Sequence, residues 1–181
     1  MKKIITLTAI IIGLLNIAHA QSYITKTGFI GFYSKTPFED IKAENKQVYA
    51  VVDLTKKNIA FVLLLKGFIF PKELMQEHFN ENYVESDKYP KASFSGAFTS
   101  TTPITGSGTY NVTVKGNLTL HNVTKQIEVP ATLQVKDDKL SGKCEFKIKP
   151  EDYNISIPSV VRDKIAKDLT VDIQIDCSTL K

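Results

Sequence analysis

The side chains able to carry out catalysis or bind a metal are few in this 181-residue chain. Outside the N-terminal segment there are two histidines, His78 and His121, and neither has a second histidine or a cysteine at metal-site spacing. The sequence contains no G-x-S-x-G nucleophile elbow, no phosphate-binding loop and no glycine-rich dinucleotide fingerprint. Its acidic residues are dispersed. The sequence therefore predicts a protein that binds or packs, with no enzymatic activity, no metal and no cofactor.

The two cysteines, Cys144 and Cys177, lie on stretches that alternate apolar and polar residues. If these stretches pair antiparallel with Cys144 opposite Cys177, Phe146 faces Ile175 on the same side of the sheet. This register predicts a Cys144–Cys177 disulfide. The alternative is two separate buried thiols, because a direct cross-strand bridge is geometrically demanding.

The elements that position these residues are mostly strands. After residue 90 the apolar residues recur with a period of two, as in Tyr110, Val112 and Val114, which predicts antiparallel strands with one buried face each. Less regular strands are predicted at 23–27, 29–34, 47–54 and 58–70. Short helices are predicted at 71–84 and 158–169, the second with Ser159 as its N-cap.

Eight or nine antiparallel strands must form a sandwich or close on themselves, and closure removes the free edges. We therefore expect one all-β domain with one or two short helices, either a sandwich or a closed barrel. The residues expected to face inward, as a tunnel wall or as ordinary core, are Phe61, Leu63, Leu65, Phe94, Phe98, Tyr110, Val112, Val114, Leu118, Ile127, Val129, Leu133, Phe146 and Ile148.

The chain begins with two lysines, an apolar run and an A-x-A box, MKKIITLTAIIIGLLNIAHA, which is typical of a bacterial Sec signal peptide. Residues 1–20 are therefore expected to be removed, leaving a domain at 21–181 in the periplasm or outside the cell. The formal net charge of +4 includes Lys2 and Lys3 of this leader, so electrostatics do not favour nucleic acid as a partner.

Three stretches resemble the YceI-like family of exported, lipocalin-like proteins described as polyisoprenoid-binding. They are LMQEHFNENYVESDKYPKASFSG at 74–96, YNVTVKGNLTLHNVTKQIEVPATL at 110–133 and EDYNISIPSVVRDKIAKDLTVDIQIDC at 151–177. The resemblance implies an extended antiparallel, lipocalin-like β-barrel of about eight strands with a long apolar tunnel. The tunnel would hold an isoprenoid-chain amphiphile, such as a quinone or a polyprenyl lipid. Polar groups near an opening would hold the head group, with Tyr23, Tyr83, Tyr89 and His121 as candidates. For His121, the alternative is a turn residue that fixes a hairpin.

The most apolar stretch outside the leader, NIAFVLLLKGFIFP at 58–71, is too short for a helical span and is read as a barrel strand, so no transmembrane segment is expected in the mature chain. Its odd residues would face the tunnel. The opposite set, Val62, Leu64, Phe68 and Phe70, would form an outer apolar patch. This patch motivates the alternative function, an envelope-stress or protein–protein interaction module with a filled barrel and a possible homodimer.

Overall fold

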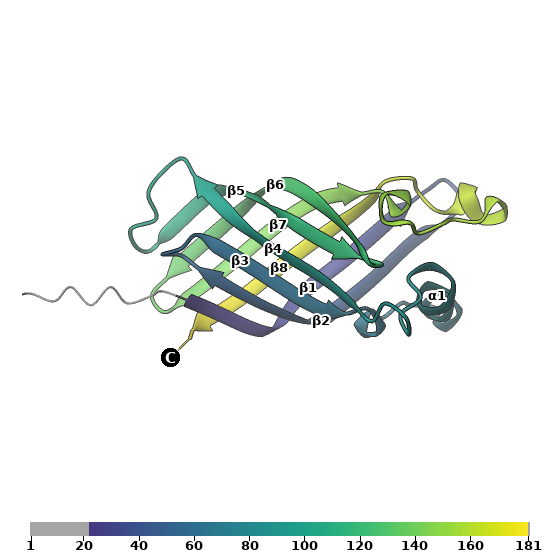
Figure 1. The fold of residues 1–181 in the computed structure, drawn as a ribbon, viewed down its shortest axis with the longest axis horizontal. Coiled ribbons are helices and arrows are strands. Elements are labelled where there is room, and N and C mark those ends of the chain that lie inside the picture. The colour runs from purple at the N-terminus through teal and green to yellow at the C-terminus, as the bar shows by residue number, and fades with distance from the viewer. Residues whose placement is uncertain (1–21, 181) are drawn as a thin grey trace, which may run out of the picture.

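The computed structural model describes residues 22–180, which form a closed barrel of eight antiparallel strands (Figure 1). Each strand pairs with the next in sequence, and β8 pairs with β1. The predicted fold class is confirmed. The predicted signal peptide lies outside the described residues. The strands are β1 (Ser22–Lys35), β2 (Asp40–Asp53), β3 (Asn58–Leu64), β4 (Lys91–Ser100), β5 (Gly108–Leu120), β6 (Val123–Lys136), β7 (Lys139–Ile148) and β8 (Leu169–Thr179).

The two ends of the barrel have connections of different length. At the end that we call the base, on the left of Figure 1, β6 joins β7 by a tight turn, and the start of β1 and the end of β8 lie here too. At the opposite end, the mouth, the chain makes its long excursions, from residue 65 to 90 and from 149 to 168. The mouth is therefore the end that the helical segments surround.

Strand β1 is one continuous, bent strand rather than the two strands predicted at 23–27 and 29–34. Its pairing with β2 shifts register between Thr25 and Gly28 and again between Gly28 and Ile30. Such bulges insert residues on one strand and bend it. The bulges also change which positions face inward, so that Tyr23 and Thr25 are buried before them and Ser34 after them.

Strand β3 ends at Leu64, six residues before the predicted end at Phe70. The buried side chain of Asn45 donates a hydrogen bond to the Leu64 carbonyl oxygen at 2.9 Å, which holds the chain as it turns into the 3₁₀ helix η1 (Leu65–Gly67). The chain then returns to β2 through paired backbone hydrogen bonds between Glu44 and Ile69.

This turn switches the inward parity. Phe68 and Phe70 are 6% and 8% exposed and lie inside, while Ile69 is 62% exposed. The predicted outer patch is therefore wrong for Phe68 and Phe70. Leu64, at 52% exposed, does face outward as expected.

The first predicted helix is present but composite. An α-helix, α1 (Glu73–His78), continues into a π-helical turn, η2 (Phe79–Tyr83). The second is only a 3₁₀ helix, η4 (Ser159–Lys164), and Ser159 is not its N-cap, because Pro158 holds that position and no side chain caps it. A further 3₁₀ turn, η3 (Pro150–Tyr153), follows β7.

Strands β6 and β7 are paired by hydrogen bonds over only part of their length. Their paired residues run from Lys136–Lys139 to Ala131–Cys144 and stop there, although β6 continues along β5 as far as Val123. The next β6 residue is Pro130, which has no N–H to donate to a neighbouring strand. Beyond this point the tip of the β5–β6 hairpin contacts η3 instead, through a 2.9 Å ion pair between Lys125 Nζ and Asp152 Oδ1.

Two clusters of buried apolar residues fill the interior unequally. The first extends from the base through the middle of the barrel, and its most enclosed members include Tyr23, Leu140 and Cys177. The second lies beneath α1 at the mouth and includes Leu63, Leu65 and Phe68. The space between and above these clusters is the candidate site.

Candidate functional site

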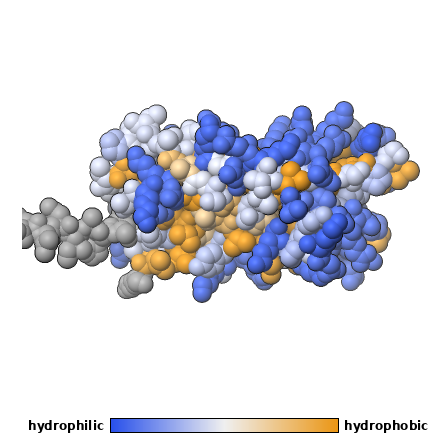
Figure 2. Space-filling view, viewed as in Figure 1, coloured by the Kyte–Doolittle hydropathy of each residue, from blue (hydrophilic) through white to orange (hydrophobic). Residues whose placement is uncertain are grey.

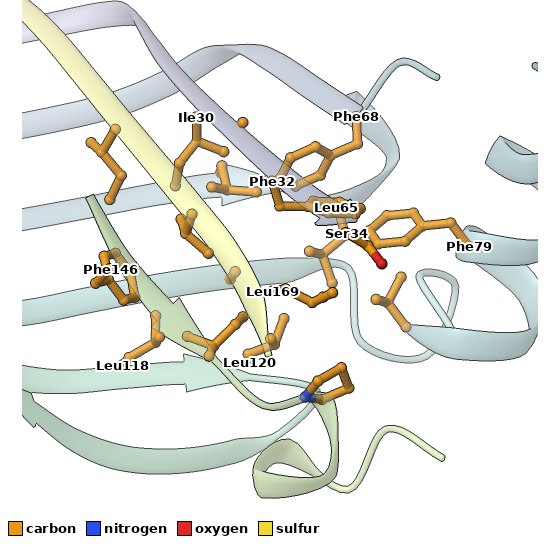
Figure 3. A pocket seen from close by; sticks show the side chains of 18 of the residues that line it. Ile30, Phe32, Ser34, Leu65, Phe68, Phe79, Leu118, Leu120, Phe146 and Leu169 are labelled. Carbon is orange, nitrogen blue, oxygen red and sulfur yellow. The ribbon is translucent and has the colours of Figure 1, made fainter. Parts of the chain in front are cut away.

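A cavity of about 500 Å³ occupies the barrel from its middle to the mouth. This volume lies in the range of pockets that bind small molecules. The strands contribute the wall with their inward residues, and α1 and η4 contribute the rim. Figure 3 shows Ile30, Leu118 and Phe146 pointing into the same space from different strands.

All of the predicted wall residues line this cavity except Tyr110 and Val112. Those two lie further toward the base. Val112 is buried in the first cluster, and the hydroxyl of Tyr110 donates a hydrogen bond to the Gly106 carbonyl oxygen at 2.9 Å. Contact between the other wall residues and a ligand stays a prediction.

The expected long tunnel is instead a blind pocket. At the base, Tyr23 and Leu140 are fully buried and Cys177 is 2% exposed, and none of the three lines the cavity. They lie on the neighbouring strands β1, β7 and β8 and belong to one buried cluster with Val52 of β2 and Val112 of β5, which also do not line the cavity. We call this group the plug. Because the plug occupies the base, a ligand in the cavity lies in the mouth half of the barrel and extends toward the mouth.

Four phenylalanines form a collar just inside the mouth. Five ring contacts join Phe32, Phe68, Phe70 and Phe79, with centroids 5.1 to 5.8 Å apart in tilted, edge-on and stacked arrangements. All four line the cavity. Figure 3 shows three of them, Phe32, Phe68 and Phe79, close together. The collar was not predictable from alternation alone, because η1 and the β1 bulges reverse the inward parity that a regular strand would keep.

A pair of glycines keeps one side of the lumen open. Gly96 of β4 and Gly116 of β5 are directly opposite each other, and a Cβ atom on Gly116 would lie only 2.7 Å from the ring of Phe94. The ring of Phe94 therefore rests over bare backbone and stacks on Phe61, with centroids 5.2 Å apart. Two inward glycines at paired positions were the signal in the sequence for this arrangement.

The charged side chains of the cavity lining gather mainly at the rim. Glu39 in the β1–β2 turn forms a 2.8 Å ion pair with Lys72, and Lys164 of η4 lies close enough to influence it. The hydrogen bond from Lys72, aided by the charges of Lys72 and Lys164, holds the pKa of Glu39 below its ordinary value. Tyr83 also lines the cavity, and burial raises the pKa of its phenol. The rim thus offers cationic and hydroxyl donors around an apolar interior.

His121 holds the mouth together and does not line the cavity. Its Nδ1 lies 3.1 Å from the Tyr153 carbonyl oxygen, its Nε2 lies 2.9 Å from Glu85 Oε2, and its ring packs edge-on against Tyr89. His121 and its neighbour Asn122 have φ of 50° and 59°, as a two-residue hairpin turn requires. Of the predicted head-group donors, Tyr83 alone lines the cavity, and His121 acts as a turn-fixing residue.

The predicted Cys144–Cys177 disulfide is wrong, because both thiols are free. Cys144 lies opposite Ile173, and Cys177 lies opposite Leu140, so the true register differs by four residues from the predicted one. Four residues along a strand separate the two thiols by about 13 Å. Cys144 lines the cavity and Cys177 belongs to the plug. Desolvation raises the pKa of Cys144 to about 11 and that of Cys177 to about 12.

Two negative findings apply to residues 22–180. No three side chains of histidine, cysteine, aspartate or glutamate come together there as a group able to hold a metal ion. No helix in this range has the length and apolar character needed to cross a membrane.

Comparison with known proteins gives the chain its context. The model of the YceI-like domain matches residues 16–177. A search of curated protein sequences found none that matches the chain. Among solved structures, a polyisoprenoid binding domain from Saccharophagus degradans, implicated in plant cell wall breakdown, is similar with a TM-score of 0.76 and 15% identity, covering 89% of this chain and 99% of the other.

Two further structures share the fold. Burkholderia cenocepacia BcnA is similar with a TM-score of 0.70 and 16% identity, covering 84% of this chain and 96% of its own. The Campylobacter jejuni YCEI protein is similar with a TM-score of 0.58 and 15% identity, and the whole of each chain is covered. At these identities the likeness concerns the fold.

Proposed function

Because the chain belongs to the YceI-like family, as its sequence resemblance indicated, we propose that it is a non-catalytic binding protein for an isoprenoid-chain amphiphile, a quinone or a polyprenyl lipid. The observation that carries the proposal is the blind apolar cavity of about 500 Å³ with its polar groups at the rim. The tail would lie among the inward strand residues, and the head group would stay near Lys72, Lys164 and Tyr83. The solved domain described as polyisoprenoid binding supports the same ligand class.

The energetics favour such a ligand without any charged contact inside. Each methylene removed from water contributes roughly 0.8 kcal/mol, so a tail of about a dozen carbons gains enough to offset the cost of immobilising it. Binding of this kind needs shape and apolar surface and leaves no polar motif in the sequence. The absence of recognisable catalytic motifs agrees with it.

We propose that the protein acts outside the cytoplasm, in the periplasm or as a secreted protein. The proposal rests on the leader-like residues 1–20. The role would be that of a carrier or buffer, which keeps an insoluble chain out of water.

The alternative, an interaction module with a filled barrel, has less support because the interior is hollow. One observation in its favour is an apolar strip on the outer wall. Tyr49 and Leu64 are 39% and 52% exposed, with Val62 half-buried beside them, and Figure 2 shows apolar surface gathered over this part of the barrel. Light scattering would reveal a homodimer that buries this strip.

The decisive experiment combines extraction with refilling. Protein purified from its own host is extracted with organic solvent for mass spectrometry, and emptied protein is titrated with a short-chain ubiquinone and with undecaprenyl phosphate. We expect a co-purified lipid and saturable uptake of at least one probe. Repeated absence of bound lipid together with no uptake of either probe would falsify the proposal.

A matched pair of variants locates the site. Ala131→Phe places a ring inside the cavity, whereas Ala60→Phe makes the same change on the exposed outer face of β3. We expect Ala131→Phe to weaken probe uptake by about tenfold or more and Ala60→Phe to leave it unchanged. Equal uptake by the two variants, each with an unchanged melting temperature, would place the ligand elsewhere.

A further inference from the structure

We propose that the mouth of the barrel docks on the surface of a phospholipid bilayer, so that the cavity opens toward the membrane. Three large apolar side chains, which we call the tips, are exposed to solvent on three separate segments around the mouth. Phe38 of the β1–β2 turn is 73% exposed, Leu74 of α1 is 60% exposed, and Val160 of η4 is 86% exposed. Single exposed apolar residues are common, but three of them around the opening of an apolar cavity indicate a contact surface.

The three segments form one end of the molecule. Glu39, next to Phe38, pairs with Lys72, two residues before Leu74. The η4 segment is attached to β1, because the backbone N–H of Ala166 donates a 2.8 Å hydrogen bond to Ser34 Oγ. All three segments lie at the right-hand end in Figure 1, and Figure 2 shows an apolar tip where η4 projects.

The tips are continuous with the cavity. Leu74 both lines the cavity and is mostly exposed, and Val161 and Glu39, the neighbours of the other two tips, line it as well. An apolar chain leaving the cavity would therefore pass between these tips and enter whatever surface they touch. A bilayer supplies an apolar phase at that place, so the tail would not have to cross water.

Basic side chains at the rim can reach phosphate head groups. Lys72 and Lys164 line the mouth together with Glu39, and Arg162 follows Val160 by two residues. The same segments also carry acidic residues, namely Asp40, Glu73, Glu77 and Asp163. Long basic side chains keep their charges in the head-group layer while apolar neighbours enter the acyl boundary. Acidic side chains are at least as numerous as basic ones on these segments, so we expect docking to depend on the apolar tips and not to require anionic lipid.

The spacing of the tips favours a bilayer over a protein partner. Each tip lies on its own segment, with charged residues between the segments, whereas a protein interface has a continuous apolar core with a polar rim. A fluid bilayer accommodates separate apolar side chains without requiring a surface of complementary shape. This inference goes beyond the proposed ligand, because it concerns the surface that the mouth faces and can be measured on emptied protein.

The test is co-sedimentation of the emptied protein with phosphatidylcholine vesicles that contain a minor fraction of phosphatidylglycerol. The tip variant is Phe38→Ser with Val160→Ser, which spares Leu74 because that residue lines the cavity. The matched control is Tyr49→Ser with Leu180→Ser, which removes one exposed aromatic and one exposed aliphatic residue from the outer wall and the base. We expect the wild type to bind, the tip variant to partition about tenfold more weakly or worse, and the control to stay within about twofold of the wild type.

Three results would overturn the inference. They are wild-type protein that stays in the supernatant, equal losses in the two double variants, and binding that disappears at high salt while the tip variant behaves as the wild type. The last result would assign the binding to the lysines alone. Quinone uptake by the same samples reports that each variant is folded, and a failure of vesicle binding leaves that uptake, and hence the proposed function, intact.

Discussion

The base and the mouth half of this barrel are built from the same alternating strands, yet one is solid and the other is hollow. At the base, Tyr23, Leu140 and Cys177 are buried in one apolar cluster with residues of the other strands, and none of the three lines the cavity. Toward the mouth, the inward residues Leu118, Phe146 and others stay half-buried because their inner surfaces face the cavity. The period-two alternation of apolar residues thus predicts which side chains face inward. Whether these side chains fill the lumen depends on the residues that face them across the barrel.

The cause of the difference lies in a few positions. Near the base, large side chains such as Tyr23 and Leu140 are fully buried within the first cluster. In the hollow half, Gly96 and Gly116 let Phe94 lie flat against the wall, and the collar phenylalanines pack on one another rather than across the lumen. A protein that binds an apolar chain in its interior needs both a packed base that stabilises the fold and a wall whose side chains leave the cavity open.

The largest expected effect comes from truncating the plug. Leu140→Ala removes a fully buried side chain where neighbours cannot close the gap, so we expect the free energy of unfolding to fall by about 3–4 kcal/mol. Leu118→Ala, made in the half-buried cavity wall, should cost only about 1–2 kcal/mol because its loss enlarges a space that already exists. Urea denaturation measures both. Equal losses would mean that the hollow half is packed in solution.

The second expected effect concerns the two thiols. Burial raises the pKa of Cys144 to about 11 from the ordinary 9.0, which lowers its thiolate fraction near neutral pH roughly 100-fold. Cys144 nonetheless faces the cavity, whereas Cys177 lies in the plug and reacts only when the barrel opens. Alkylation followed by peptide mass spectrometry should therefore modify Cys144 first, by roughly tenfold or more, and faster as the pH rises.

Two controls accompany the thiol measurement. A ligand in the cavity should protect Cys144, and the intact mass should be the same with and without reductant, because no disulfide links the two cysteines. Faster modification of Cys177 than of Cys144 would reverse the assignment of the solid and hollow halves.

The smallest expected effect is at the plug hydroxyl. Tyr23 is fully buried and its hydroxyl has no hydrogen-bond partner among the described residues, so Tyr23→Phe should leave the free energy of unfolding unchanged or raise it by up to about 1 kcal/mol. In Tyr110→Phe, by contrast, the hydrogen bond to Gly106 is lost, and we expect a decrease of about 0.5–1 kcal/mol. Thermal melts of both variants give the comparison, and a clear loss in Tyr23→Phe would reveal a partner for that hydroxyl.

The barrel and most of its inward residues were predictable because period-two alternation survives in regular strands. The prediction failed where the backbone leaves that regularity. The bulges around Gly28 and the turn pinned by Asn45 change the inward parity, so Phe32, Phe68 and Phe70 were not recognised as cavity residues. The Cys144–Cys177 register was wrong because apolar pairs of the same parity fit equally well four residues apart. Pairing registers of this kind depend on turn lengths at both ends of the strands.

The hydrogen-bond ladder between β6 and β7 stops within the hollow half of the barrel. Beyond Ala131 and Cys144, β6 is hydrogen-bonded to β5 alone, while β5 stays paired with β4 as far as Ser93 and Thr119. Contacts of His121 and Lys125 with η3 hold the tip of the β5–β6 hairpin. Along this line the wall beside a bound tail therefore rests on side-chain contacts rather than on backbone pairing. We expect the lumen to accommodate thick or branched tails more easily here than at the base, where the β6–β7 ladder is continuous.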